Sequence, residues 1–212
     1  MGTILICGCG PSLHEDIAAS RRRTVPRIAV NGAAAVIIAD YLFTLHTEII
    51  ARYAAQQAAL RSERGMMGRP AELIAAVPER GPFTPHCFPI DHWMAIPERR
   101  ATSGWAAIYA AIHLGFRDIV LCGVPLNGGE GAAAGTGSDF GDKPAGGPTI
   151  MRVQAAARQY AAELSRAHPA VSVHSMSGFT REILGLPKNM LDTPAGTSEG
   201  ARHGRRKGRR RE

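Results

Sequence analysis

The first residues of the chain place the strongest constraint on its fold. Thr3–Cys7 is short, apolar and partly β-branched, which is typical of a buried strand in a parallel sheet. Gly8 and Gly10 follow at once, and a residue without a Cβ allows close backbone approaches. Pro11 suits the first turn of a helix, where its missing N–H group costs nothing. A strand, a glycine turn and a helix start in this order predict an α/β fold whose turn presents free N–H groups to an anion.

This turn departs from the standard phosphate-binding motifs. Leu13 stands where the dinucleotide pattern G-x-G-x-x-G requires its third glycine. No Gly-Lys-Ser or Gly-Lys-Thr sequence follows, as a P-loop requires. Two interpretations therefore stay open, a nucleotide-binding turn and a tight strand–helix connection without a ligand.

A second turn of the same kind opens a helix in the middle of the chain. Thr102 and Ser103 are residue types preferred at helix N-caps, and Trp105, Ile108 and Ile112 follow at helical spacing. Hydroxyl groups beside Gly104 at a helix N-terminus suit a phosphate or a ribose. Helix capping alone is the simpler interpretation of the same residues.

Strands and helices are predicted to alternate along most of the chain. Further strands are expected at residues 27–30, 40–46, 118–122 and 170–174, with one more near Cys87 in an otherwise irregular stretch, 78–100. Helices are expected at residues 47–64 and 70–77, after Pro148 and at 180–184. The pattern predicts a single Rossmann-like α/β domain with a mainly parallel sheet over residues 1–187.

Ligands of open α/β sheets lie at the carboxyl ends of the strands. This rule brings together Gly8 to Ser12, Asn31, His46, Gly123 and Ser175 to Gly178. His46 ends a predicted strand, and a histidine can take a proton from an attacking hydroxyl near neutral pH. It is therefore the candidate catalytic base, with a strand-end residue of no catalytic role as the alternative. His92, beside Asp91, is a second candidate.

Three short blocks occur in an order that resembles two related families. They are Gly8-x-Gly10-Pro11-Ser12-Leu13, Arg100-x-Thr102-Ser103-Gly104 and Leu114-Gly115-Phe116-Arg117-Asp118-Ile119, with Asn31 after the second predicted strand. Over about residues 3–186 the series resembles the bacterial sialyltransferases that use CMP-sialic acid and sialylate lipooligosaccharide. It also resembles the family typified by archaeal 6-hydroxymethylpterin diphosphokinase.

The resemblance to the sialyltransferases implies a glycosyltransferase-like variant of the fold and a CMP-linked sugar donor. The residues that it implies at the nucleotide are Gly8, Gly10, Pro11, Ser12, Asn31, Arg100, Thr102, Ser103 and Gly104. It implies no metal site and does not identify the acceptor. A pterin diphosphokinase-like pyrophosphoryl transferase would instead need Mg²⁺.

Two departures from these families bear on the reaction. Pro125 stands where family members carry an acidic residue, which counts against Mg²⁺-dependent pyrophosphoryl transfer. Between Pro125 and Thr149 the chain has no Tyr or His, which the sialyltransferases place in a lid. The glycine-rich stretch 127–147 is nevertheless predicted to order over a bound donor, with Asp139 or Asp142 facing a metal or the acceptor. A nucleotide-binding module without catalysis is the third open function.

The positive charge is concentrated in the last residues. The chain carries a formal charge of +7, but residues 202–212 hold seven of its 25 Lys and Arg and only one of its 18 acids. Residues 188–212 are therefore predicted to be a flexible basic tail. Its charge suits nucleic acid or an anionic surface, although it has no aromatic side chain to stack on bases. A solubilising tail is the alternative.

The cysteines and the hydropathy pattern predict a cytoplasmic protein. Cys7, Cys9, Cys87 and Cys122 form no C-x-x-C pair, and three of them lie in or beside apolar runs, so they are interpreted as reduced thiols. No apolar run is long enough to span a bilayer, and no signal peptide pattern is present. The sequence carries no signature that assigns an oligomeric state.

Overall fold

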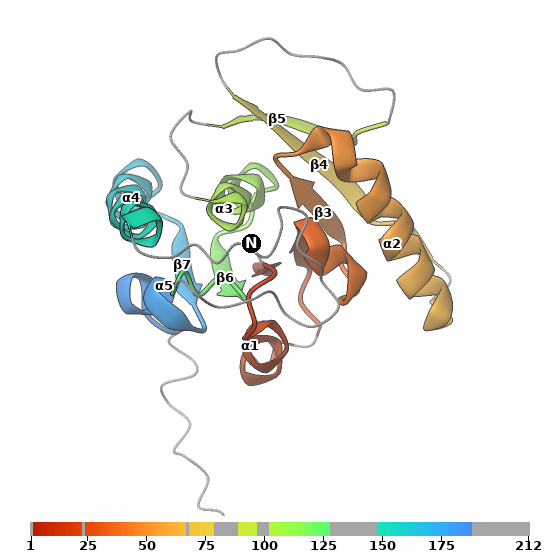
Figure 1. Ribbon diagram of the computed structural model, residues 1–212, viewed down its shortest axis with the longest axis horizontal. Coiled ribbons are helices and arrows are strands. Elements are labelled where there is room, and N and C mark those ends of the chain that lie inside the picture. The colour runs from red at the N-terminus through yellow and green to blue at the C-terminus, as the bar shows by residue number, and fades with distance from the viewer. Residues whose placement is uncertain are drawn as a thin grey trace, which may run out of the picture.

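The computed structural model describes residues 2–22, 24–66, 68–78, 89–96, 102–127 and 148–187. These residues form a single α/β domain around one seven-stranded sheet (Figure 1). The strands are β1 (Thr3–Cys7), β2 (Arg27–Val30), β3 (Tyr41–Thr44), β4 (Glu72–Pro78), β5 (His92–Ile96), β6 (Asp118–Cys122) and β7 (Ser172–Ser175). The α-helices are α1 (Leu13–Ala19), α2 (Ile50–Glu63), α3 (Ser103–His113), α4 (Pro148–Ala167) and α5 (Gly178–Leu184), and the 3₁₀ helices are η1 (Asn31–Ala35) and η2 (Thr47–Ile49).

The sheet reverses its direction of growth between β1 and β6. Its strand order is β5-β4-β3-β2-β1-β6-β7, and every pairing is parallel. The chain thus builds outward from β1 to β5, then returns to place β6 on the free side of β1. In the register, Thr3 pairs with Asp118 and Cys7 with Cys122, so β1 and β6 begin and end together. Such a reversal leaves a crevice at the carboxyl ends of the two strands.

Helices cover both faces of the sheet, which confirms the predicted α/β class (Figure 1). Alternate residues of β1 face opposite cores. Ile4 and Ile6 pack in one core with residues of α3, α4 and α5, while Leu5 and Cys7 pack in the other with residues of α1 and α2. Burial on both faces explains why these strands are continuous apolar runs in the sequence.

The predicted helix at 70–77 is wrong, because β4 occupies most of that stretch. Alanine and glutamate favour a helix locally, but β4 lies between β3 and β5 and buries side chains on both faces. Leu73 and Ala75 belong to one core, and Ile74 and Ala76 to the other. The edge strand β5 likewise replaces part of the stretch predicted to be irregular.

The predicted helix after Thr102 is confirmed as α3. Thr102 Oγ1 accepts a hydrogen bond from Trp105 N at 3.3 Å, and Gly115, with a φ of +88°, follows the end of the helix. Several predictions lie outside the described residues: Arg100, Cys87, Asp139 and Asp142, most of the stretch 127–147 and the tail 188–212. The domain boundary at 187 stays a prediction. In the part of the chain described here, no helix is both long and apolar enough to cross a membrane.

Candidate functional site

A cavity of about 290 Å³ opens where the sheet reverses its direction of growth. It lies at the carboxyl ends of β1, β2 and β6 and at the start of α3. Six residues predicted to contact a nucleotide line it: Gly8, Gly10, Asn31, Thr102, Ser103 and Gly104. Cys9, Val30 and residues 123–126 complete the described lining. Pro11 and Ser12 are not part of this lining.

The two glycines of the first turn pack that turn against the loop after β6. Gly8 N donates to Cys122 O and Gly10 N to Gly123 O, both at 2.8 Å. A Cβ on Gly10 would lie 2.5 Å from Pro125 Cδ and 2.7 Å from Gly123 O, so no side chain fits. The prediction that this turn presents free N–H groups to an anion is therefore wrong for these two amides, because carbonyl groups at the end of β6 already accept their hydrogen bonds.

The start of α3 supplies the polar wall of the cavity. The N–H groups in the first turn of an α-helix have no acceptor within the helix, and the helix dipole makes this end positive. Thr102 caps one of them, the amide of Trp105. Ser103 Oγ has no hydrogen bond to another described residue, and both Ser103 and Gly104 line the cavity. This wall can therefore receive an anionic or hydroxyl-bearing group.

Asn31 also lines the cavity, and its side chain carries an unpaired acceptor. It has a φ of +53°, a left-handed conformation that asparagine tolerates better than most residues. Its Oδ1 is buried and accepts no hydrogen bond from the described residues. Because leaving a buried acceptor unpaired is costly, an N–H or O–H group that reached this oxygen would stabilise the arrangement.

The described lining of the cavity carries no charged side chain. Beneath it, Cys7 and Cys122 are fully buried. Burial raises the pKa of the Cys7 thiol to about 12 and raises the pKa of Cys122 well above its usual value, so both remain protonated. Cys9 lines the cavity, and its Sγ donates to Val30 O at 3.4 Å. Among the described residues, no group of three or more His, Cys, Asp or Glu side chains is placed to hold a metal ion.

Sequence reasoning missed the residues that hold the wall formed by the loop after β6. Thr180 Oγ1 donates to Val124 O at 2.6 Å, and Gln154 Nε2 donates to Leu126 O at 2.8 Å. No local pattern marks Thr180 and Gln154, because their partners are distant in the sequence. Ser12 also has a supporting place, at the N-cap of α1, where its hydroxyl contacts Asp16 and Ser177.

The two histidine candidates lie at different edges of the sheet. His46 follows β3 at the carboxyl edge, with 34% of its side chain exposed and its Nδ1 3.5 Å from Glu48 Oε1. It is not part of the described cavity lining. His92 is the first residue of β5, and its Nε2 lies 2.7 Å from Glu72 Oε2 at the amino end of β4. The structure thus separates His92 from the cavity.

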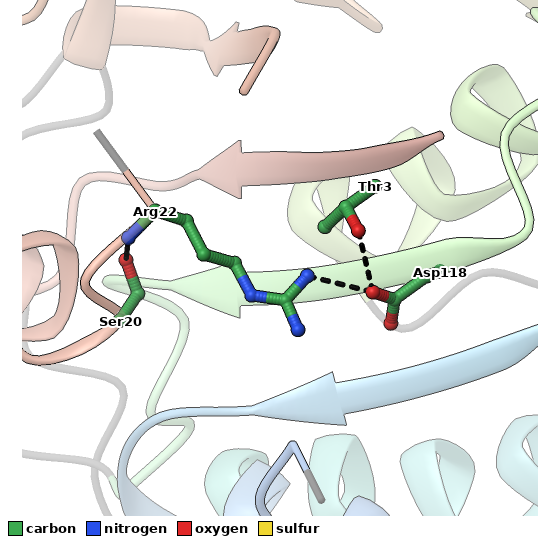
Figure 2. A network of polar contacts seen from close by, with 4 residues as sticks. All are labelled: Thr3, Ser20, Arg22 and Asp118. Carbon is green, nitrogen blue, oxygen red and sulfur yellow. Dashed lines mark hydrogen bonds and ion pairs between the residues drawn. The ribbon is translucent and has the colours of Figure 1, made fainter. Parts of the chain in front are cut away.

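An ion pair lies at the amino ends of β1 and β6, the ends of these strands that are remote from the cavity (Figure 2). Asp118 Oδ2 accepts from Thr3 Oγ1 and from Arg22 Nη1, both at 2.6 Å. Burial alone would raise the pKa of Asp118, but these two hydrogen bonds and the charge of Arg22 together lower it. Asp118, which belongs to the third sequence block, therefore lies at the amino edge of the sheet, away from the cavity.

No protein-family model and no curated protein sequence matches the chain. Solved structures of a sialyltransferase do. A variant of the α-2,3/8-sialyltransferase CstII has a TM-score of 0.60 at 12% identity, covering 91% of this chain and 90% of that one. CstII from Campylobacter jejuni with the substrate analogue CMP-3FNeuAc has a TM-score of 0.59 at 12% identity, covering 90% and 88%. CST-II with CMP and a trisaccharide acceptor has a TM-score of 0.60 at 13% identity, covering 91% and 89%.

This likeness shows a sialyltransferase-like fold and, at such low identity, the fold alone. It agrees with the fold that the three sequence blocks imply. The resemblance to the pterin diphosphokinase family stays a prediction.

Proposed function

We propose that the chain is a transferase that uses a nucleotide-linked sugar and binds its CMP part in the cavity between β1 and β6. The observation that carries this proposal is the convergence of four separate segments on one cavity, whose lining includes the start of α3 and Asn31, a residue with an unpaired Oδ1. The solved structures of similar fold include complexes of those proteins with CMP and with a CMP-linked analogue, which supports the choice of nucleotide.

The uncharged lining suits a single phosphate better than a diphosphate. A sugar joined to CMP carries one phosphodiester charge, which a helix N-terminus and a serine hydroxyl can solvate. Nucleoside diphosphates and ATP are commonly bound with Mg²⁺ held by carboxylates or with cationic side chains, and the described lining provides neither. Asn31 Oδ1 is suited to accept a hydrogen bond from the cytosine amino group or from a ribose hydroxyl.

The proposed reaction is a direct displacement at the anomeric carbon. The acceptor oxygen forms a bond to that carbon while the bond from the carbon to the phosphate oxygen breaks, and CMP leaves with the electron pair. The acceptor hydroxyl loses its proton to a general base, for which His46 is the proposed residue. Its position at the carboxyl edge, after β3, supports this role if the acceptor reaches from the cavity toward β3.

Calorimetric titration with CMP, CDP, UDP and ATP, each with and without Mg²⁺, tests the nucleotide. CMP should bind without metal. Asn31→Gly should weaken CMP binding about tenfold, because it removes an acceptor worth roughly 1.4 kcal/mol, while glycine retains the backbone conformation. The control is Ser165→Ala at an exposed position of α4, which should leave the CMP affinity unchanged.

The other outcomes separate the alternatives. Binding of ATP only with Mg²⁺ would favour pyrophosphoryl transfer, and equal CMP affinity in the wild type and Asn31→Gly would contradict the proposed site. CMP release from CMP-sialic acid should be lost in His46→Asn if His46 is the base. A wild type that binds CMP but consumes no donor with any sugar acceptor would be a binding module.

A further inference from the structure

A buried carboxylate behind the cavity wall joins three loops. Asp16 lies in the first turn of α1 and is 5% exposed. Its Oδ2 accepts hydrogen bonds from Gly123 N at 2.8 Å, from Ser177 Oγ at 2.7 Å and from Ser12 Oγ at 3.0 Å. The three donors follow β6, β7 and β1 respectively, so one oxygen atom connects the carboxyl ends of three strands.

These contacts close a ring that includes the two glycine loops of the cavity, namely the loop after β1 with Gly8 and Gly10 and the loop after β6 with Gly123. Gly10 N donates to Gly123 O at 2.8 Å, and Leu13 N donates to Gly10 O at 3.0 Å, at the start of α1. Asp16, one turn along α1, then returns to Gly123 through its amide. Gly10 and Gly123 line the cavity, whereas Asp16 is not part of the described lining. The side chain of Asp16 therefore acts on the cavity only through the backbone that it holds.

A second set of contacts runs from Asp16 through Ser177 to Val124 and Pro125, the next residues of the same wall. Ser177 precedes α5, and Thr180 of α5 donates through Oγ1 to Val124 O at 2.6 Å and through N to Pro125 O at 3.4 Å. By holding Ser177, Asp16 also fixes the helix start that supports Val124 and Pro125. The wall from Gly123 to Pro125 is thus held directly at its first residue and indirectly at the two that follow.

We propose that Asp16 is a positioning residue that sets the separation of the two glycine loops and so the shape of the nucleotide cavity. The proposed ligand is the one given above, so this part of the inference rests on the proposed function. Without the carboxylate, the buried Gly123 amide loses its side-chain acceptor, and the two serine hydroxyls retain, among the described residues, their contact with each other. Such a loss frees the loops to separate, which a purely stabilising ion pair elsewhere would not do.

The experiment compares Asp16→Ala and Asp16→Asn with Asp118→Asn. Asp118 lies on β6, paired with the other end of β1, and is part of the stabilising ion pair, so it is the matched control. The dissociation constant for CMP and the exchange rates of the Gly10 and Gly123 amides are measured at a temperature where all the proteins are folded. Ser177→Ala, which retains the carboxylate, replaces Asp16→Ala if that variant does not fold.

Asp16→Ala should weaken CMP binding about tenfold and accelerate amide exchange at Gly123 by a similar factor, since a lost buried acceptor has this order of effect. Asp16→Asn keeps an acceptor oxygen and should remain within about threefold of the wild type. Asp118→Asn should lower the thermal midpoint but leave both quantities unchanged.

Equal CMP affinity and equal Gly123 exchange in Asp16→Ala and Asp118→Asn would overturn the proposal, since both residues would then be merely stabilising. A wild type that binds no CMP would instead refute the proposed function. In that case the exchange of Gly10 and Gly123 still decides whether Asp16 positions the loops.

Discussion

The two ends of the β1–β6 pair are held together by different kinds of contact. At the amino end, Thr3, Arg22 and Asp118 join the strands through a charged network of side chains. At the carboxyl end, Gly8 and Gly10 approach Gly123 so closely that backbone groups bond directly, and the described cavity lining is uncharged.

The difference separates the end of the strand pair that side-chain contacts stabilise from the end that leaves a cavity for a ligand. At the amino end, side-chain hydrogen bonds and an ion pair join the strands. At the carboxyl end the strands lead into loops on opposite sides of the reversal point, and glycines keep these loops thin. The space that a side chain on Gly8 or Gly10 would need is taken by residues 123–125 of the neighbouring loop, and the cavity opens beside these packed loops. The carboxylate at this end, Asp16, lies behind the wall and not in it.

The largest expected effect breaks the close backbone approach at the carboxyl end. Gly10→Ala should lower the free energy of unfolding by about 2–4 kcal/mol, because its Cβ meets Pro125 and the Gly123 carbonyl at less than van der Waals distance. Urea denaturation followed by circular dichroism measures this change. Gly68→Ala is the control, since its Cβ meets no atom within 4 Å, and it should change stability by less than about 0.5 kcal/mol. Equal stability of the two variants would show that the glycine loops are not tightly packed.

A smaller effect is expected at the amino end. Asp118→Asn should cost about 1–2 kcal/mol at neutral pH, because it leaves the half-buried Arg22 guanidinium without its carboxylate. It should leave CMP binding unchanged, in contrast to changes at the carboxyl end. A changed CMP affinity would contradict the division of roles between the two ends.

The effect of Asp118→Asn on the free energy of unfolding should depend on pH. The pKa of Asp118 is lowered in the folded protein, so the unfolded chain takes up this proton first as the pH falls. Its contribution is present above the ordinary aspartate pKa of 3.8 and is lost as the pH falls through the lower, folded value. The difference in unfolding free energy between wild type and Asp118→Asn should therefore shrink in acid, and a constant difference in urea titrations down to that range would refute this account.

The smallest expected effect sharpens the role of the start of α3. Thr102→Ala removes the cap on the Trp105 amide and should cost about 1 kcal/mol, whereas Thr102→Ser retains a hydroxyl and should cost less than half of that. Thermal unfolding measures both. If the serine variant is as unstable as the alanine variant, the cap hydrogen bond does not explain the stability of this helix end.

Much of the central sheet could be predicted because its local and tertiary preferences agree. Residues 3–7, 27–30 and 118–122 are strands with the predicted bounds, since short β-branched runs suit strands buried on both faces. The helix predicted for residues 70–77 was wrong for the opposite reason, because local and tertiary preferences disagree there. Its alanines favour a helix, but pairing with β3 and β5 outweighs that preference.

The candidate site divides in the same way. Asn31 could be placed beside the first glycine turn because the carboxyl ends of parallel strands meet at one edge. Thr102 and Ser103 could be placed there because they open a helix, whose N-terminus suits a phosphate, and because the resemblance implies it. The use of the Gly8 and Gly10 amides could not, since their acceptors belong to the loop after β6. In the sequence, Asp16 is an acid that follows Pro11 closely, which suits a helix N-terminus but does not reveal its contacts with Gly123 and Ser177.

The sequence by itself determines the local features: which runs are apolar enough to be strands, which residues cap helices, and where a glycine allows a turn. Contacts between distant segments are not, because they depend on which loops the sheet brings together. The chain order therefore predicted an α/β domain and the edge of the sheet where a ligand would bind. Only the tertiary fold brought the start of α3 to the cavity. The packing of β1 against β6 decided that the loops after these two strands bond to each other and that one buried carboxylate holds the cavity wall. Both of these require groups more than a hundred residues apart to meet within hydrogen-bonding distance.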